Sequence, residues 1–168
     1  MAWYHQISAK ILEKFPGLYE WLTLKTAGEI PADLEKDPFV PYEHDPFDSR
    51  IMLITTGGVH TPEQTPFDMS DSRGDTSFRL IPRDQKVFEI THDYYDHSDA
   101  DTDINCLFPL PLVRKLHKND VMGEPVEHHV SFMGHIEDPL LPELINESMP
   151  SLWDELTDRP DLILLSPG

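Results

Sequence analysis

A short apolar run that opens into a pair of glycines most constrains the fold of this chain. Ile51 to Ile54 are four consecutive apolar residues, and Gly57-Gly58 and then His60 follow closely. Continuous rather than alternating apolarity predicts a strand from Ile51 to Thr55 that is buried on both faces, as in a parallel sheet. The glycines predict a tight turn at the carboxyl end of this strand, where open α/β sheets place their ligands. We therefore expect His60 to stand at a functional edge of the sheet.

Three other segments are also predicted to be strands. They are Val87 to Ile90, Val130 to Met133 and Leu162 to Leu165. The last of them is so apolar that we expect it in the middle of the sheet, buried on both faces.

Helices are predicted between these strands. Leu112 to Asn119 carries lysines toward its end, which suit the negative end of a helix dipole. A second helix begins near Pro142 and is expected to end at Pro150, after which Ser151 caps a third. The alternation of strands and helices implies right-handed crossovers. The predicted fold class is therefore α/β, with three layers and a mainly parallel sheet.

The N-terminal part of the chain has a different pattern. Two helices are expected there, and the second, shorter one occupies residues 18–24. Residues 27–48 are a proline-rich, acidic connection. The 16 prolines of the chain predict long irregular loops. We therefore divide the chain into N-terminal helices with a proline-rich connection, residues 1–48, and an α/β region, residues 49–168, within one structural domain overall. The first helix is predicted from apolar residues that recur every four positions, at Trp3, Ile7, Ile11 and Phe15.

Composition excludes several classes of partner. A formal net charge of -18 repels phosphate, which argues against binding to nucleic acid or to an anionic membrane surface. The first residues lack the basic and apolar segments of a signal peptide, and no run reaches the length of a membrane-spanning helix. Cys106 is the single cysteine, so an internal disulfide is excluded. These features predict a soluble cytoplasmic protein.

A second block, Thr91 to Asn105, packs two histidines and five aspartates into one segment. Its alternating aspartates are not an EF-hand, because Ile104 stands where glycine is required and Leu110 where a glutamate should be. A metal site of another kind remains an alternative, since histidine and carboxylate ligands suit zinc and related ions. The residues that could form it are His92, His97, Asp99 and His128.

The histidines are candidates for acid–base chemistry, because imidazole titrates near physiological pH. Nearby aspartates are expected to raise the pKa of His92 and of His97. Cys106 lies among apolar residues, which predicts a small buried side chain and not a nucleophile.

Ordered blocks between Ser49 and Gly168 carry a family resemblance. The blocks are Thr55-Thr-Gly-Gly-Val-His60, Pro66-Phe-Asp68, Gly74-Asp-x-Ser-Phe-Arg79, Ile81-Pro82, Thr91-His-x-x-Tyr-Asp96, Ser98-Asp-Ala100, Asp103-Ile-Asn105, Phe108-Pro109 and Ser131-Phe-Met-Gly134. Together they resemble the selenoprotein B family of glycine, sarcosine, betaine and D-proline reductases, and most closely its shorter, D-proline-reductase-like members.

The resemblance implies reductive cleavage of a carbon–nitrogen bond. In such reductases a pyruvoyl group on a partner subunit captures the substrate amine, and a selenol attacks the substrate carbon. The selenol belongs to a selenocysteine-x-x-cysteine-like motif that follows an apolar strand and a short turn. Here Leu162 to Leu165 matches the strand and Ser166 to Gly168 the turn. We therefore expect a selenocysteine just beyond Gly168, encoded by a UGA codon at which this sequence was cut short, and no other bound cofactor.

The implied function is that of the substrate-reducing component of an amino-acid or amine reductase, with a small amino acid or amine as substrate and a pyruvoyl-containing subunit as partner. Gly57-Gly58, His60 and Gly168 are expected on one edge of the sheet, with residues 91–103 folded over it. A metal-dependent enzyme and a non-catalytic binding or assembly subunit are the alternatives. The predicted catalytic residues are His60, His92 and His97, and the predicted substrate-binding residues are Thr56, Gly57, Gly58, Asp96, Asp99 and Asp101, with no metal ligands.

Overall fold

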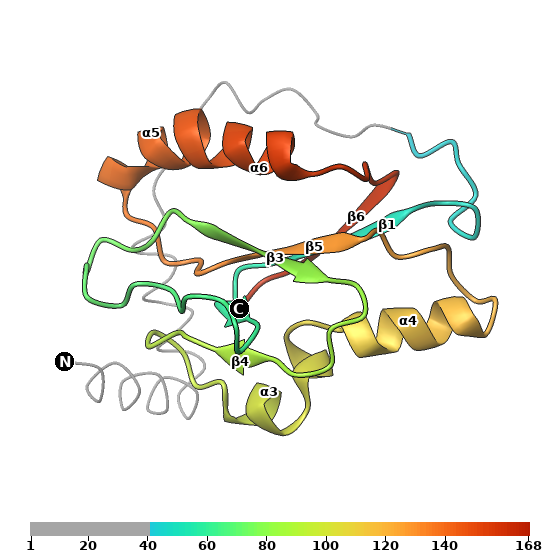
Figure 1. Cartoon of the computed structure of the whole chain (residues 1–168), viewed down its shortest axis with the longest axis horizontal. Helices are drawn as coiled ribbons and strands as arrows, with labels where there is room; N and C mark the ends of the chain where they lie inside the picture. Colours follow the sequence, from blue (N-terminus) through green and yellow to red (C-terminus); the bar gives the residue numbers. More distant parts are fainter. Residues whose placement is uncertain (1–40) are drawn as a thin grey trace, which may run out of the picture.

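The computed structural model describes residues 41–168, which form a sheet with helices on both sides (Figure 1). The helices predicted at residues 3–15 and 18–24, and much of the proline-rich connection, lie outside the described residues. The strands are β1 (Ile51–Thr55), β2 (Val59–His60), β3 (Phe78–Pro82), β4 (Glu89–Ile90), β5 (His128–Phe132) and β6 (Leu162–Ser166). The helical segments are α3 (Ser98–Thr102), η2 (Ile104–Cys106), α4 (Leu110–Lys118), η3 (Asp138–Leu140), α5 (Leu141–Glu143), η4 (Leu144–Ser148) and α6 (Met149–Glu155).

The main sheet has the strand order β3-β5-β1-β6. β1 runs parallel to both β5 and β6, whereas β3 pairs antiparallel with β5. The prediction of an α/β fold with a mostly parallel sheet is therefore confirmed. The antiparallel β3 was not predicted. β2 and β4 form a separate two-stranded antiparallel sheet. The strand predicted from Val87 to Ile90 is present but shorter, because only Glu89 and Ile90 pair with β2.

β1 is buried on both faces, as its continuous apolarity predicts. Leu53 packs into a core cluster on the α4 side, whereas Met52 and Ile54 pack on the α6 side. Figure 1 shows α6 above the sheet and α4 below it. One strand thus contributes to both cores, which places it at the centre of the fold.

The last strand, β6, differs from its prediction. It lies at the edge of the main sheet, and alternate side chains are exposed, Ile163 by 45% and Leu165 by 75%. Leu164, between them, packs against the core cluster that contains Leu53. The prediction of a strand buried on both faces in the middle of the sheet is therefore wrong, because β1 occupies that position and the described residues cover one face of β6.

The helical run from Asp138 to Glu155 passes straight through Pro150. A π-helical segment, η4, occupies Leu144–Ser148, and Pro150 then falls in the first turn of α6. The Met149 amide donates to the Leu144 carbonyl five residues back, and Pro150, which has no amide hydrogen, stands where this wider turn gives way to α6. The predicted break at Pro150 and the predicted cap at Ser151 are wrong, because the wider π turn shifts the pattern of backbone bonds.

Cys106 is exposed at the end of η2, which corrects the prediction that it is buried. The apolar neighbours Leu107 and Phe108 take the buried positions of this turn instead.

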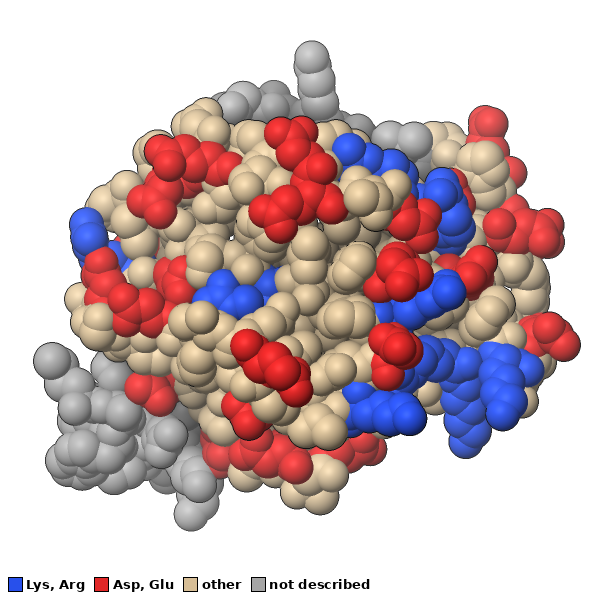
Figure 2. Space-filling view, viewed as in Figure 1, with Lys and Arg blue, Asp and Glu red and all other residues tan. Residues whose placement is uncertain are grey.

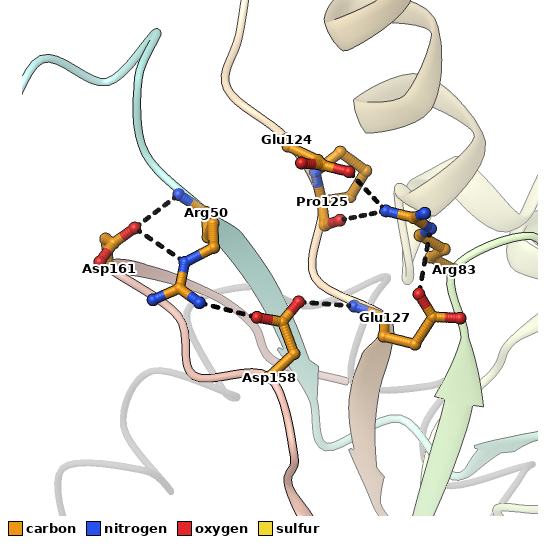
Figure 3. A network of polar contacts seen from close by, with 7 residues as sticks. All are labelled: Arg50, Arg83, Glu124, Pro125, Glu127, Asp158 and Asp161. Carbon is orange, nitrogen blue, oxygen red and sulfur yellow. Dashed lines mark hydrogen bonds and ion pairs between the residues drawn. The ribbon is translucent and has the colours of Figure 1, made fainter.

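A network of charged side chains joins the strands at the edge formed by the amino ends of β1, β5 and β6 and the carboxyl end of β3 (Figure 3). The guanidinium of Arg50, just before β1, contacts Asp158 at 2.8 Å and Asp161 at 3.3 Å, both in the segment that leads into β6. The Asp158 carboxylate also accepts a hydrogen bond from the Glu127 amide, just before β5. Arg83, after β3, contacts Glu127 at 3.4 Å. Every strand of the main sheet is thus tied to a neighbour at this edge.

The acidic composition is visible on the surface. Figure 2 shows aspartate and glutamate spread over the visible face, whereas lysine and arginine gather at the end where α4 lies. Within residues 41–168, no helix combines the length and apolarity that crossing a bilayer requires.

Candidate functional site

A cavity of about 300 Å³ opens at the carboxyl ends of β1, β5 and β6. The amide of Gly168, beyond β6, donates to the Thr56 hydroxyl at 3.1 Å. This contact confirms that the turn after β1 and Gly168 share one edge of the sheet. Segment 91–95 lies over the same edge, as expected. The described residues that line the cavity are Thr56, His92, Tyr94, Tyr95, Gly134, His135 and Gly168.

Two glycines allow the backbone segments to approach closely here. Gly134 has φ of 89°, and a Cβ atom at this position would stand 2.3 Å from the Thr56 carbonyl oxygen. Gly58 has φ of 70°, and a Cβ atom there would stand 2.3 Å from the Thr91 carbonyl oxygen. Both backbone conformations suit glycine and strain other residues. The glycines therefore set the shape of the edge that carries the cavity.

The amides of the predicted glycine turn already have partners within the protein. The Gly57 amide donates to the Thr55 hydroxyl at 3.1 Å, and the Gly58 amide donates to the Phe132 carbonyl at 2.9 Å. Gly57 and Gly58 thus hold the loop together, and the predicted contact between these glycines and a substrate stays a prediction.

His92 lines the cavity as an uncharged ring. Its Nδ1 accepts a hydrogen bond from the Tyr94 amide at 3.1 Å. Burial lowers the pKa of His92 from 6.5 to about 4, and the neighbouring His135 and His97 act in the same direction. Asp93 opposes this shift but does not outweigh it. The prediction that aspartates raise the pKa of His92 is therefore wrong, because the loss of water around the ring dominates.

His135 was not predicted as a site residue, although it directly follows β5 and Gly134 in the sequence. Its Nε2 lies 3.0 Å from the Ser72 carbonyl oxygen and donates to it, so Nδ1 is the unprotonated nitrogen of the neutral ring. The ring stacks on Tyr94, with 4.0 Å between ring centroids and 20° between planes. The available signal was the pattern it shares with β1, an apolar strand followed by glycine and then histidine.

Tyr95 forms the adjoining part of the wall. Its hydroxyl donates to the Gly57 carbonyl at 2.9 Å, and its ring centroid lies 4.4 Å from that of His92. Burial raises the pKa of Tyr95, so the phenol stays protonated at neutral pH. Tyr95 therefore connects the turn after β1 to the ring of His92.

His60 is buried and bonded at both ring nitrogens. Nδ1 donates to the Thr61 carbonyl at 2.9 Å, and Nε2 accepts from the Thr91 hydroxyl at 2.8 Å. This arrangement joins β2 to the start of the segment that covers the cavity. His60 does not line the cavity, so its predicted catalytic role stays a prediction without direct access to this space.

The other predicted residues of the loop lie outside the cavity wall. His97 pairs with Asp101 at 2.9 Å across one turn of α3. Asp101 lines a different hollow, between α3 and the segment before β4. Asp96 and Asp99 do not line the 300 Å³ cavity either. Of the residues predicted from sequence, the cavity brings together Thr56 and His92, and the roles of the rest stay predictions.

The metal alternative finds no support in the arrangement of side chains. In the part of the chain that the structure describes, no three histidine, cysteine or carboxylate side chains are placed to hold one metal ion. His92, His97, Asp99 and His128 therefore do not form the ligand set that this alternative requires.

The chain is similar to a curated protein, D-proline reductase subunit gamma of Acetoanaerobium sticklandii. The two sequences are 32% identical over 124 residues, which are 72% of this chain and 49% of that protein. The aligned part of this chain thus spans about half the length of the relative. No protein-family model matches the chain. No solved structure matches it either. The similarity supports a D-proline-reductase-like family, whereas the assignment to selenoprotein B and a selenocysteine beyond Gly168 stay predictions.

Proposed function

We propose that this chain belongs to the substrate-reducing component of a multi-subunit reductase that cleaves a carbon–nitrogen bond of D-proline or a related amino acid or amine. The similarity to D-proline reductase subunit gamma carries this proposal. The cavity at the carboxyl ends of the parallel strands supports it, because open α/β sheets bind small ligands there.

The proposed reaction breaks the bond between a substrate carbon and its nitrogen. A selenol attacks the carbon, and the nitrogen departs with a proton as an amine. A neighbouring thiol then attacks the selenium, and the carbon leaves with the electrons of the carbon–selenium bond and takes up a second proton. The selenol and the thiol supply two electrons and end joined by a selenium–sulfur bond. A pyruvoyl group on the partner subunit would hold the substrate amine before cleavage. A selenocysteine that follows Gly168 would stand beside the cavity, since Gly168 lines it.

We assign proton transfer to His135. Its Nδ1 is unprotonated in the neutral ring, because Nε2 donates to Ser72. His92 is less suited to this role, because a pKa of about 4 makes it a weak base at neutral pH. Its ring is proposed to shape the wall and to hold the Tyr94 backbone.

The test is reductive cleavage by the full-length protein, produced with selenocysteine and combined with a pyruvoyl-containing subunit and a dithiol reductant. Mass spectrometry should detect the ring-opened amino acid from D-proline. His135→Gln keeps a donor for the Ser72 carbonyl but lacks the basic nitrogen. It should lower kcat by about a hundredfold, the range of a lost general acid or base, and remove a limb of the pH–rate profile.

His97→Gln is the matched variant, because His97 was predicted as catalytic but pairs with Asp101 outside the cavity wall. It should lower kcat much less than His135→Gln does. Equal losses in both variants would contradict the role of His135. Binding of D-proline without any cleavage by the complete complex would instead favour a non-catalytic binding subunit.

A further inference from the structure

The wall of the cavity is made largely of aromatic rings. His92 lies edge-on to Tyr95, with 4.4 Å between centroids, and to Tyr94, with 5.8 Å between centroids. Tyr94 in turn stacks on His135 at 4.0 Å. These four rings form one contiguous surface, which we call the aromatic wall, beside the backbone of Thr56, Gly134 and Gly168.

The aromatic wall lies in negative surroundings. Among the described residues, those lining the cavity include no lysine, arginine, aspartate or glutamate. His92 is neutral at pH 7 because its pKa is lowered to about 4. Burial raises the pKa of Tyr94, and the carboxylates of Asp93, Glu137 and Asp71 raise it further by their negative charge. A cation entering the cavity would therefore lie beside electron-rich aromatic rings, within a field that attracts it.

We propose that the aromatic wall is a cation–π subsite that receives the positively charged nitrogen of the ligand, with Tyr94 as its specificity-determining residue. This inference rests on the proposed function and adds how the substrate nitrogen is held. Aromatic surfaces of this kind select alkylated ammonium groups, which are diffuse and weakly hydrated. The sequence had suggested the aspartates of the loop as the groups that receive the amine. The structure places rings, and not those aspartates, at the cavity.

The test uses the full chain and two probes of equal shape. Choline carries a trimethylammonium group, and its neutral isostere carries a tert-butyl group in the same position. Binding is followed by calorimetry and by chemical-shift changes of the Tyr94 and His135 rings. Choline should bind and the neutral isostere should bind at least several-fold more weakly. Tyr94→Leu removes the ring and should weaken choline binding by about tenfold. Tyr94→Phe keeps the ring and should stay within about twofold of the original affinity, as an unchanged aromatic face requires.

Equal binding of choline and its neutral isostere would overturn the proposal, and so would the absence of choline binding up to millimolar concentration. An unchanged affinity in a folded Tyr94→Leu variant would overturn it as well. If that variant does not fold, the comparison of the two probes on the unchanged chain still decides. Cleavage of D-proline without a preference for the cationic probe would refute the subsite and leave the proposed function standing. A preference for the cationic probe without cleavage of D-proline would refute the proposed function and leave the subsite standing.

Discussion

The two edges of the main sheet are built from different interactions. At the amino ends of the strands, charged side chains reach from one strand to the next, as in the contacts of Arg50 with Asp158 and Asp161 (Figure 3). At the carboxyl ends, backbone segments approach through Gly58 and Gly134, and aromatic rings fill the space between them.

The difference separates two requirements of the fold. The charged edge links neighbouring strands through long side chains that remain exposed to solvent. The other edge must leave a cavity, so its loops are fixed by close backbone packing and by buried polar rings such as His60. The contrast is that ion pairs link the strands at the charged edge, whereas no lysine, arginine, aspartate or glutamate of the described residues lines the cavity.

Acidification should first destabilise the cavity edge, where His92 lies, and the middle of the sheet, where His129 bonds to Leu53. Burial is the main cause that lowers the pKa of His92 and of His129 from 6.5 to about 4, so the unfolded chain binds more protons between these two pH values. The stability that depends on their neutral forms is fully present above pH 6.5 and is lost as the pH falls toward 4. Each shift corresponds to about 3 kcal/mol. Urea unfolding at a series of pH values measures the loss.

The charged edge should respond at lower pH. The Arg50 backbone and guanidinium lower the pKa of Asp161 below 3.8, so its contribution is present above that value and is lost only below it. Amide protection near Tyr94 should therefore fall at a higher pH than protection near Leu162. A His92→Phe variant should lose roughly half of the destabilisation between pH 6.5 and 4, since His129 supplies the rest. A urea midpoint that is constant across this range would contradict the assignment.

Gly134→Ala should be the next largest perturbation. The new methyl group would overlap the Thr56 carbonyl oxygen, and the alanine would have to adopt the φ of 89° that Gly134 has. We expect a loss of about 3 kcal/mol in the free energy of unfolding, together with weaker ligand binding. Asp120 offers a control, because it has φ of 54° without being glycine. Asp120→Gly should change stability by less than about 1 kcal/mol.

Arg50→Met should have the smallest effect. It removes contacts with Asp158 and Asp161, but these groups are exposed, and exposed ion pairs contribute little in water. The urea midpoint should fall slightly at low salt, and the difference from the unchanged protein should shrink at high salt. Arg73→Met is the matched control, because Arg73 pairs with Asp71 within a single loop. If both variants lose the same stability, the charged edge does not hold the strands together.

The sequence predicted those elements whose apolar residues form an unbroken run. β1 appears with its predicted bounds, and β5, β6 and α4 lie within two residues of theirs. β3 escaped prediction because it is an edge strand with Arg79 near its centre, so its apolar residues form neither a continuous run nor a clear alternation. The exposure of β6 was also missed, because an apolar run in the sequence does not show whether the strand will lie at the centre or at the edge of the sheet.

The site could be predicted as a place but only partly as a set of residues. Strand direction alone put Thr56 and Gly168 at one edge, and the loop containing His92 over it. Tyr94 and His135 were missed because a stacked pair from two distant segments leaves no local pattern. The direction of the His92 pKa shift was missed because burial, which outweighs a neighbouring aspartate, depends on the whole fold.

The position of β1 at the centre of the sheet has a consequence for how the protein is made. The Leu53 amide donates a hydrogen bond of 2.9 Å to a ring nitrogen of His129, which is 76 residues later in the chain. The Arg50 amide donates to the carboxylate of Asp161, which is 111 residues later. At a translation rate of roughly 5–20 residues per second, β1 is made several seconds or more before its partner strands β5 and β6. Contacts this distant in sequence also slow folding. During synthesis, the strand that later forms the centre of the sheet is therefore made well before its partner strands.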